Sequence, residues 1–186
     1  FRRVLFPIYL KVTDIPKMEN AEFADLMARF EPLVKHFNRY LTIGGFPELA
    51  LSDDDLYAQR MLREDVVDKV IKRDVLTLFK VRSPLLMEKL FLYLCMNSTE
   101  IFSATTAAKE LDNISPNTIE SYVDALVKSN LIYMAYPIAV GSKSVLKGRP
   151  KIYIADAAIR NAVLMVDDVL SDERELGLLI ETTVYK

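Results

Sequence analysis

Four cations lie close together near residue 147, in a segment that contains no acidic residue. The segment from Gly141 to Lys151 is Gly-Ser-Lys-Ser-Val-Leu-Lys-Gly-Arg-Pro-Lys, so the cations are Lys143, Lys147, Arg149 and Lys151. Cations grouped in a turn can bind phosphate groups by electrostatic attraction, and binding of this kind weakens steeply as the salt concentration rises. The sequence therefore predicts a loop that contacts phosphate, and the alternative is an ordinary solvated hairpin loop.

A second group of polar side chains shares one face of the helix predicted to follow Ser115. This face carries Asn117, Ser121, Asp124 and Lys128, with Thr118 and Glu120 beside it. Asn and Ser can hydrogen-bond to base edges, and Lys can meet phosphate. We therefore expect nucleic-acid contacts from Asn117, Thr118, Ser121 and Lys128. Two carboxylates on the same helix would repel phosphates, so a helix that only packs the domain is the alternative.

Groups that could catalyse a reaction are scarce. One histidine, His36, and one cysteine, Cys95, cannot form a zinc site or a Cys/His nucleophile pair. We expect Cys95 to be a small buried residue, because its neighbours are apolar, and His36 to be solvated or capping. Asp53, Asp54 and Asp55 open a predicted helix and point in different directions, which fits a solvated cap better than a metal site. No P-loop motif occurs, so we expect no bound cofactor in this chain.

Composition narrows the classes of protein further. Half of the 186 residues (51%) are apolar and the net charge is −2, which indicates an ordered protein with no bulk electrostatic reason to bind DNA or a membrane. The apolar run from Leu85 to Met96 is too short to span a bilayer and contains two charges. A single cysteine and the lack of a signal peptide indicate a cytoplasmic protein. The chain begins without Met and stops inside an apolar pattern, so we expect a fragment of a larger protein.

The elements that position the candidate contacts follow from the periodicity. Ser103–Leu111 and Ser115–Asn130 are two predicted helices joined by Asp112-Asn-Ile114, which is typical of a helix-turn-helix. The second helix has a core stripe of Ile119, Val123, Leu126 and Val127. Two apolar runs, Leu131–Ala139 and Lys151–Ala155, predict strands on either side of the basic loop. Together these elements predict a winged helix.

The residues before Ser103 are predicted to be mainly helical. Between Asn20 and Tyr40 the apolar positions recur at three and four, and Pro32 should bend or divide the helix. Thr42–Glu48 is a predicted turn, and Asp53–Phe79 is a second predicted helix. Its apolar positions are Leu56, Met61 or Leu62, Val66, Val70, Ile71, Val75 and Leu78. Ser83 and Pro84 should cap a third helix that ends at Met96, while residues 1–13 suggest a strand or an extended arm.

Four short motifs appear in one order along the chain. They are Gly44-Gly-Phe-Pro-Glu48, Val70-Ile-Lys-Arg-Asp-Val75, Ser115–Leu126 with Leu131-Ile and Pro137, and Lys151-Ile-Tyr-Ile-Ala-Asp156. In this order they resemble the C-terminal region of bacterial and archaeal AAA-type P-loop ATPases that carry a conserved C-terminal domain of unknown function. The resemblance covers nearly the whole chain from about residue 40.

The resemblance implies a particular domain order. An ATPase core, with its ATP and Mg²⁺, would lie before Phe1, and residues 1–19 would be the strand or arm leaving it. Residues 20–82 would be a helical segment, residues 83–165 a winged-helix domain, and residues 166–186 a linker and the start of a truncated nuclease-like domain. In such nuclease folds a Glu on the first helix can help to hold a catalytic metal, which would be Glu181 here. Its partners would lie beyond Lys186.

The sequence thus predicts a mainly α-helical chain with a winged helix, which is a non-catalytic fragment of an AAA-type ATPase. The leading function is a nucleic-acid-binding or regulatory module that works with the ATPase and nuclease-like domains, with DNA as a partner and no membrane. The alternative is a protein–protein interaction domain, or a scaffold between domains, with no DNA binding. Glu120, Asp124 and the net charge favour that alternative.

Overall fold

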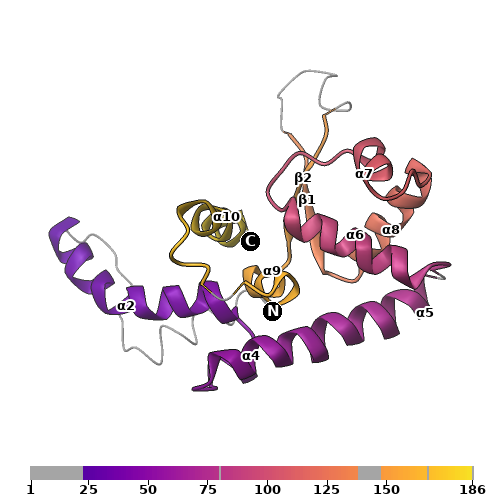
Figure 1. Ribbon diagram of the computed structural model, residues 1–186. Helices are drawn as coiled ribbons and strands as arrows, with labels where there is room; N and C mark the ends of the chain where they lie inside the picture. The colour runs from indigo at the N-terminus through magenta and orange to yellow at the C-terminus, as the bar shows by residue number, and fades with distance from the viewer. Residues whose placement is uncertain (1–22, 80, 138–147, 167, 186) are drawn as a thin grey trace.

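The computed structural model describes residues 23–79, 81–137, 148–166 and 168–185. This part of the chain is mainly helical with one small antiparallel sheet, as predicted (Figure 1). The predicted arm at residues 1–13 lies outside the described residues. Where the chain is described, no helix is both long and apolar enough to cross a membrane.

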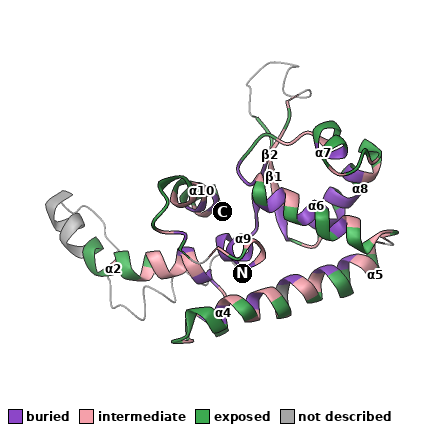
Figure 2. Cartoon of the chain, in the orientation of Figure 1, coloured by how far each residue is buried: buried purple, intermediate pink, exposed green. Residues whose placement is uncertain are grey.

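The first helix, α2 (Phe23–Ile43), is the one predicted from Asn20 to Tyr40, and it continues through Pro32 without being divided. A proline inside a helix removes one backbone hydrogen bond, and here the loss does not end the helix. The apolar face is not buried along its whole length. Phe30, Val34 and Phe37 are 40–52% exposed, whereas Leu41 and Ile43 are fully buried at the C-terminal end (Figure 2).

A long helical stretch follows the short helix α3 (Pro47–Ala50). It consists of α4 (Asp55–Met61), the π-helical segments η1 (Leu62–Asp68) and η2 (Val70–Val75), and α5 (Leu76–Leu78). The predicted helix is confirmed, but its predicted apolar stripe is wrong at both ends, because Leu56 and Leu78 are 69% and 72% exposed. The buried positions are Ala58, Leu62, Val67, Ile71 and Val75. The step of five from residue 62 to residue 67 reflects the wider winding of the π-helix.

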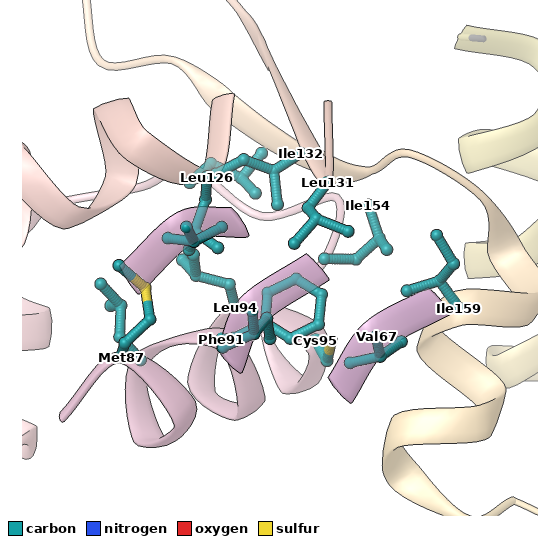
Figure 3. Packing of buried hydrophobic residues seen from close by; sticks show 14 of the residues in the cluster. Val67, Met87, Phe91, Leu94, Cys95, Leu126, Leu131, Ile132, Ile154 and Ile159 are labelled. Atoms are coloured by element: carbon teal, nitrogen blue, oxygen red, sulfur yellow. The ribbon is translucent and has the colours of Figure 1, made fainter. Parts of the chain in front are cut away.

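The next elements form the second half of the main core. They are α6 (Pro84–Met96), α7 (Ala104–Glu110), α8 (Pro116–Lys128), β1 (Ile132–Ala135) and β2 (Lys151–Ile154). The Ser83 hydroxyl accepts a hydrogen bond from the Leu86 amide, so the predicted cap of α6 is confirmed. β1 and β2 are antiparallel, and Ile132 lies opposite Ile154. Figure 3 shows side chains of α6, α8 and both strands packed together, with Cys95 buried among them as predicted.

The helix α9 (Ala157–Leu164) lies at the centre of the molecule (Figure 1). It contacts α2, α4, η1, α6 and β2, and the last helix, α10 (Glu173–Tyr185), contacts α2, α9 and β2. Arg160 of α9 is almost fully buried. Its guanidinium donates to Cys95 O at 3.0 Å and to both carboxylate oxygens of Glu175 at 2.5 and 3.2 Å. One buried cation therefore connects α6, α9 and α10.

A close backbone approach joins the end of α2 to the start of α9. Gly44 has a φ of +76°, and a Cβ there would lie 2.4 Å from Asp156 Oδ1 and 2.8 Å from Ala158 Cβ. Asp156 caps α9 by accepting a hydrogen bond from the Ala158 amide, and it also accepts one from the Gly45 amide at 3.4 Å. The first and the fourth of the sequence motifs thus meet in the folded chain. Since Asp156 lies two residues after the end of β2, this junction also holds the chain where it leaves that strand.

Candidate nucleic-acid interface

The helices α7 and α8 are separated by a tight turn with the residues that such a turn favours. The Ser103 hydroxyl accepts a hydrogen bond from the Thr106 amide and begins α7. Asp112 and Asn113 both have positive φ, of 62° and 54°, a conformation that Asn and Asp tolerate better than most residues. The Ile114 amide then donates to Ala108 O at 3.0 Å. The predicted pair of helices and their connection are confirmed.

The buried side of α8 agrees with the predicted stripe. Ile119, Val123 and Leu126 are at most 3% exposed, and Val127 packs against the core with partial exposure. Tyr122 is also buried, and its hydroxyl accepts a hydrogen bond from the Ser83 amide at 3.0 Å, which ties α8 to the start of α6. Ser115 occupies the N-cap position as predicted, but its side chain makes no capping hydrogen bond.

The opposite side of α8 faces outward and carries the predicted contact residues. Asn117, Ser121 and Lys128 are exposed, and Thr118 is half-buried. Glu120 is also exposed. Lys128 Nζ forms an ion pair with Asp124 Oδ2 at 2.6 Å, one turn away on the same helix. This face therefore offers hydrogen-bonding groups, while its cation is already paired with a carboxylate.

The start of β2 brings a second predicted cation together with the predicted metal ligand. Lys151 Nζ and the Tyr153 hydroxyl both donate to Glu181 Oε1, each at 2.9 Å. The Tyr153 ring stacks on Tyr185, with centroids 4.0 Å apart and an angle of 12° between planes. Two residues of β2 and two of α10 thus form one cluster, which we call the β2–α10 cluster.

Protonation in the β2–α10 cluster follows from these contacts. The hydrogen bond from Lys151 holds the pKa of Glu181 below its ordinary value, and the bond from Tyr153 acts in the same direction, against the effect of partial burial. Burial, with the hydrogen bond to Glu181, raises the pKa of Tyr153 to about 12. At neutral pH, Glu181 is therefore a carboxylate and Tyr153 a neutral donor.

The remaining cations of the predicted basic loop are only partly described. Arg149 is exposed and lies two residues before β2. Lys143 and Lys147 lie outside the described residues, and their predicted role stays a prediction. Because α8 contacts β1 and β1 pairs with β2, the α8 face and the start of β2 belong to neighbouring elements.

The predicted metal role of Glu181 finds no complete set of ligands in the described part of the chain. No three His, Cys, Asp or Glu side chains gather there in a way that could hold a metal ion. Asp54 is the N-cap of α4, accepting from the Tyr57 amide at 2.9 Å, so the expected capping role of the Asp53–Asp55 run is confirmed. His36 is half-buried on α2, and its expected solvated or capping role stays a prediction.

Sequence reasoning did not single out Tyr153, which shares Glu181 with Lys151. Because side chains alternate along a strand, the sequence alone predicts that residues 151 and 153 lie on the same side of β2. Their common partner lies about thirty positions further along the chain, and no local pattern connects it to the strand.

Comparison with known proteins places most of the chain in one family. A family described as a domain of unknown function (DUF8612) matches residues 34–170. The chain is also 25% identical over 157 residues to the uncharacterized protein MJ1544 of Methanocaldococcus jannaschii, which covers 82% of this chain. This chain therefore spans only about a third (33%) of the length of MJ1544. No solved structure matches the chain.

Proposed function

This chain belongs to the family described as a domain of unknown function (DUF8612), and we propose that it is a non-catalytic winged-helix module that binds nucleic acid. The observation that carries the proposal is the outward face of α8. Asn117, Ser121 and Lys128 are exposed on that face, while the opposite face is buried in the core. A helix presented in this way can enter a major groove and offer polar side chains to base edges.

The strand pairing supports a winged helix. Residues 99–102, between α6 and α7, pair with β2: Thr99 N donates to Ile152 O, Ile152 N to Glu100 O, and Phe102 N to Pro150 O, at 2.7 to 3.1 Å. The order is then helix, extended segment, two helices and two strands, with the extended segment beside β2. The basic segment joins the last two strands, where the wing of such a domain lies.

The charges of the described residues set the expected strength of binding. Lys128 is paired with Asp124 and Lys151 with Glu181, whereas Arg149 has no ion pair among the described residues. The described residues would then make between one and three phosphate contacts, and Lys143 and Lys147 would add up to two more. With a log–log salt slope of about −0.9 per contact, the contacts of the described residues alone should make affinity fall roughly 3-fold to 40-fold between 50 and 200 mM salt.

Fluorescence anisotropy with a labelled 20-base-pair duplex, at 50 and 200 mM salt, tests the proposal. The Lys128→Ala, Arg149→Ala, Lys151→Ala triple variant should weaken binding. A matched triple variant, Lys69→Ala, Lys72→Ala, Arg73→Ala, removes the same charges from the exposed side of the long helical stretch. It should bind like the unmodified chain. Equal loss in both variants, or no binding at 50 mM salt, would overturn the proposal.

A protein–protein role is the second candidate, because carboxylates accompany the cations. Glu120 and Asp124 lie on the same exposed part of α8, and Asp124 already holds Lys128. A surface of mixed charge suits a protein partner or a neighbouring domain better than a polyanion. Since Cys95 is buried, a Ser121→Cys thiol would be the one that a maleimide reaches. Protection of that thiol in the longer protein, but not by DNA, would favour this candidate.

We also propose that the module belongs to a larger AAA-type ATPase, in keeping with the order of the sequence motifs. ATP and Mg²⁺ would bind ahead of Phe1, and α10 would be the first helix of a nuclease-like domain. The relative MJ1544, three times as long as the matching region, leaves room for such domains. A parent gene with no P-loop motif upstream of Phe1 would remove the ATPase from the proposal and leave the winged helix unaffected.

A further inference from the structure

The β2–α10 cluster places a carboxylate against a cation that the proposed function needs. Glu181 Oε1 lies 2.9 Å from Lys151 Nζ, and these side chains are 42% and 44% exposed, so solvent reaches both. A phosphate oxygen that bound Lys151 would have to share the ammonium group with Glu181 or displace it. Either way, a negative charge stays within a few ångströms of the phosphate.

A second hydrogen bond and the packing of α10 hold the Glu181 carboxylate beside Lys151. The same oxygen also accepts a hydrogen bond from the Tyr153 hydroxyl. Its helix is fixed on both sides of residue 181, since Leu179 and Thr182 are at most 3% exposed and the Tyr185 ring stacks on Tyr153. The packing of α10 therefore brings the carboxylate to β2, where two donors hold it beside Lys151.

We propose that Glu181 is an intramolecular competitor for phosphate, and that α10 thereby weakens the binding of nucleic acid at the start of β2. This inference rests on the proposed function. With α10 in place, Lys151 is neutralised. When α10 moves away from β2, or when the charge on Glu181 is removed, Lys151 becomes a full phosphate contact.

The charge-removing variant Glu181→Gln tests the inference in the same anisotropy assay. One additional phosphate contact adds about −0.9 to the log–log salt slope, which is about a 3-fold greater loss of affinity between 50 and 200 mM salt. We expect Glu181→Gln to bind the duplex roughly 3- to 10-fold more tightly at 50 mM salt and to show this steeper slope. Asp65→Asn is the matched control, because Asp65 pairs with Lys69 on the long helical stretch and the net charge changes equally.

A double-mutant cycle separates masking of Lys151 from a general change of charge. Lys151→Gln should weaken binding by less than about 2-fold when Glu181 is present, since the cation is already neutralised. In the Glu181→Gln background it should abolish the whole gain. The midpoint of thermal unfolding of each variant, compared with that of the unmodified chain, checks that the fold is retained.

The outcomes distinguish the inference from the proposed function. If the unmodified chain binds and Glu181→Gln behaves like Asp65→Asn, the inference is wrong and the proposed function stands. If the Lys151→Gln effect is equal in both backgrounds, the inference is also wrong. If neither the unmodified chain nor Glu181→Gln binds at 50 mM salt, the proposed function fails and the inference fails with it.

Discussion

Replacing Gly44 by alanine should unfold the junction between α2 and α9. The new Cβ would lie 2.4 Å from Asp156 Oδ1 and 2.8 Å from Ala158 Cβ, closer than Cβ atoms approach other heavy atoms. The backbone φ of +76° adds strain, since only glycine adopts it without cost. Asp156 is also the cap of α9, so it cannot move away without loosening that helix.

The expected loss of stability is the sum of two effects. The left-handed conformation costs a residue with a Cβ about 1–2 kcal/mol. Forcing extra atoms into a packed site costs typically about 1–3 kcal/mol. The free energy of unfolding should therefore fall by about 2–5 kcal/mol. In a protein of this size the midpoint of thermal unfolding moves by about 2–4 °C per kcal/mol, so we expect a decrease of roughly 4–20 °C.

Circular dichroism, with urea and thermal unfolding, measures the change. Gly177→Ala is the matched control, because a Cβ at that helical glycine meets nothing within 4 Å. Alanine is the better helix former, so Gly177→Ala should leave stability unchanged or raise it by up to about 1 kcal/mol. Gly44→Ala should also cost less in an Asp156→Ala background, where the nearest overlapping atom is gone. A loss below about 1 kcal/mol, or equal losses in both backgrounds, would refute the close approach.

Further predictions concern the charged and titratable groups. Glu175→Gln leaves the buried Arg160 without its carboxylate and should lower the free energy of unfolding by about 2 kcal/mol. This is less than the roughly 3–5 kcal/mol of fully buried pairs, because Glu175 is 26% exposed. A loss below about 0.5 kcal/mol, the level expected of an exposed pair, would contradict a stabilising role of the Arg160–Glu175 ion pair. The folded pKa of Glu181 lies below its ordinary value of 4.5, so the stability that ionised Glu181 contributes is fully present above that value and is lost as the pH falls through the folded pKa. The stability difference between the unmodified chain and Glu181→Gln should therefore shrink from pH 6 to pH 3. A constant difference would contradict this. Ultraviolet titration should show one tyrosine ionising near pH 12 that is missing in Tyr153→Phe. Burial raises the pKa of the Cys95 thiol, so a disulfide reagent should modify it only in denaturant, and rapid reaction of the folded chain would be the contrary result.

Helices whose buried face follows the helical period could be predicted from the sequence. The stripe of α8 is an example, because Ile119, Val123 and Leu126 follow the helical period and face the core formed with α6 and the strands. The cap at Ser83 was also predicted, whereas Ser115 has the same residue type at a predicted N-cap and makes no capping hydrogen bond. The long helical stretch was predicted, but its π-helical winding shifted the buried positions, since periodicity assumes 3.6 residues per turn.

What joins distant parts of the chain was not readable. Gly44 and Asp156 belong to two separate motifs, and the sequence does not show that one packs against the other. Lys151 pairs with Glu181, about thirty positions further along the chain. The sequence predicts Lys151 as a cation available to phosphate, whereas in the folded chain it is already paired with a carboxylate. Charge patterns reveal which side chains are present, whereas tertiary packing decides which of them remain available to a ligand.

The salt dependence of duplex binding tests the proposed nucleic-acid interface most directly. Anisotropy titrations of the unmodified chain between 25 and 200 mM salt should give a log–log slope between about −0.9 and −4.5, for one to five phosphate contacts with Lys143 and Lys147 counted. The triple variant of Lys128, Arg149 and Lys151 should weaken binding and make the salt slope shallower. No binding at 25 mM salt, or binding that keeps its slope in the triple variant, would contradict an interface formed by α8 and the start of β2.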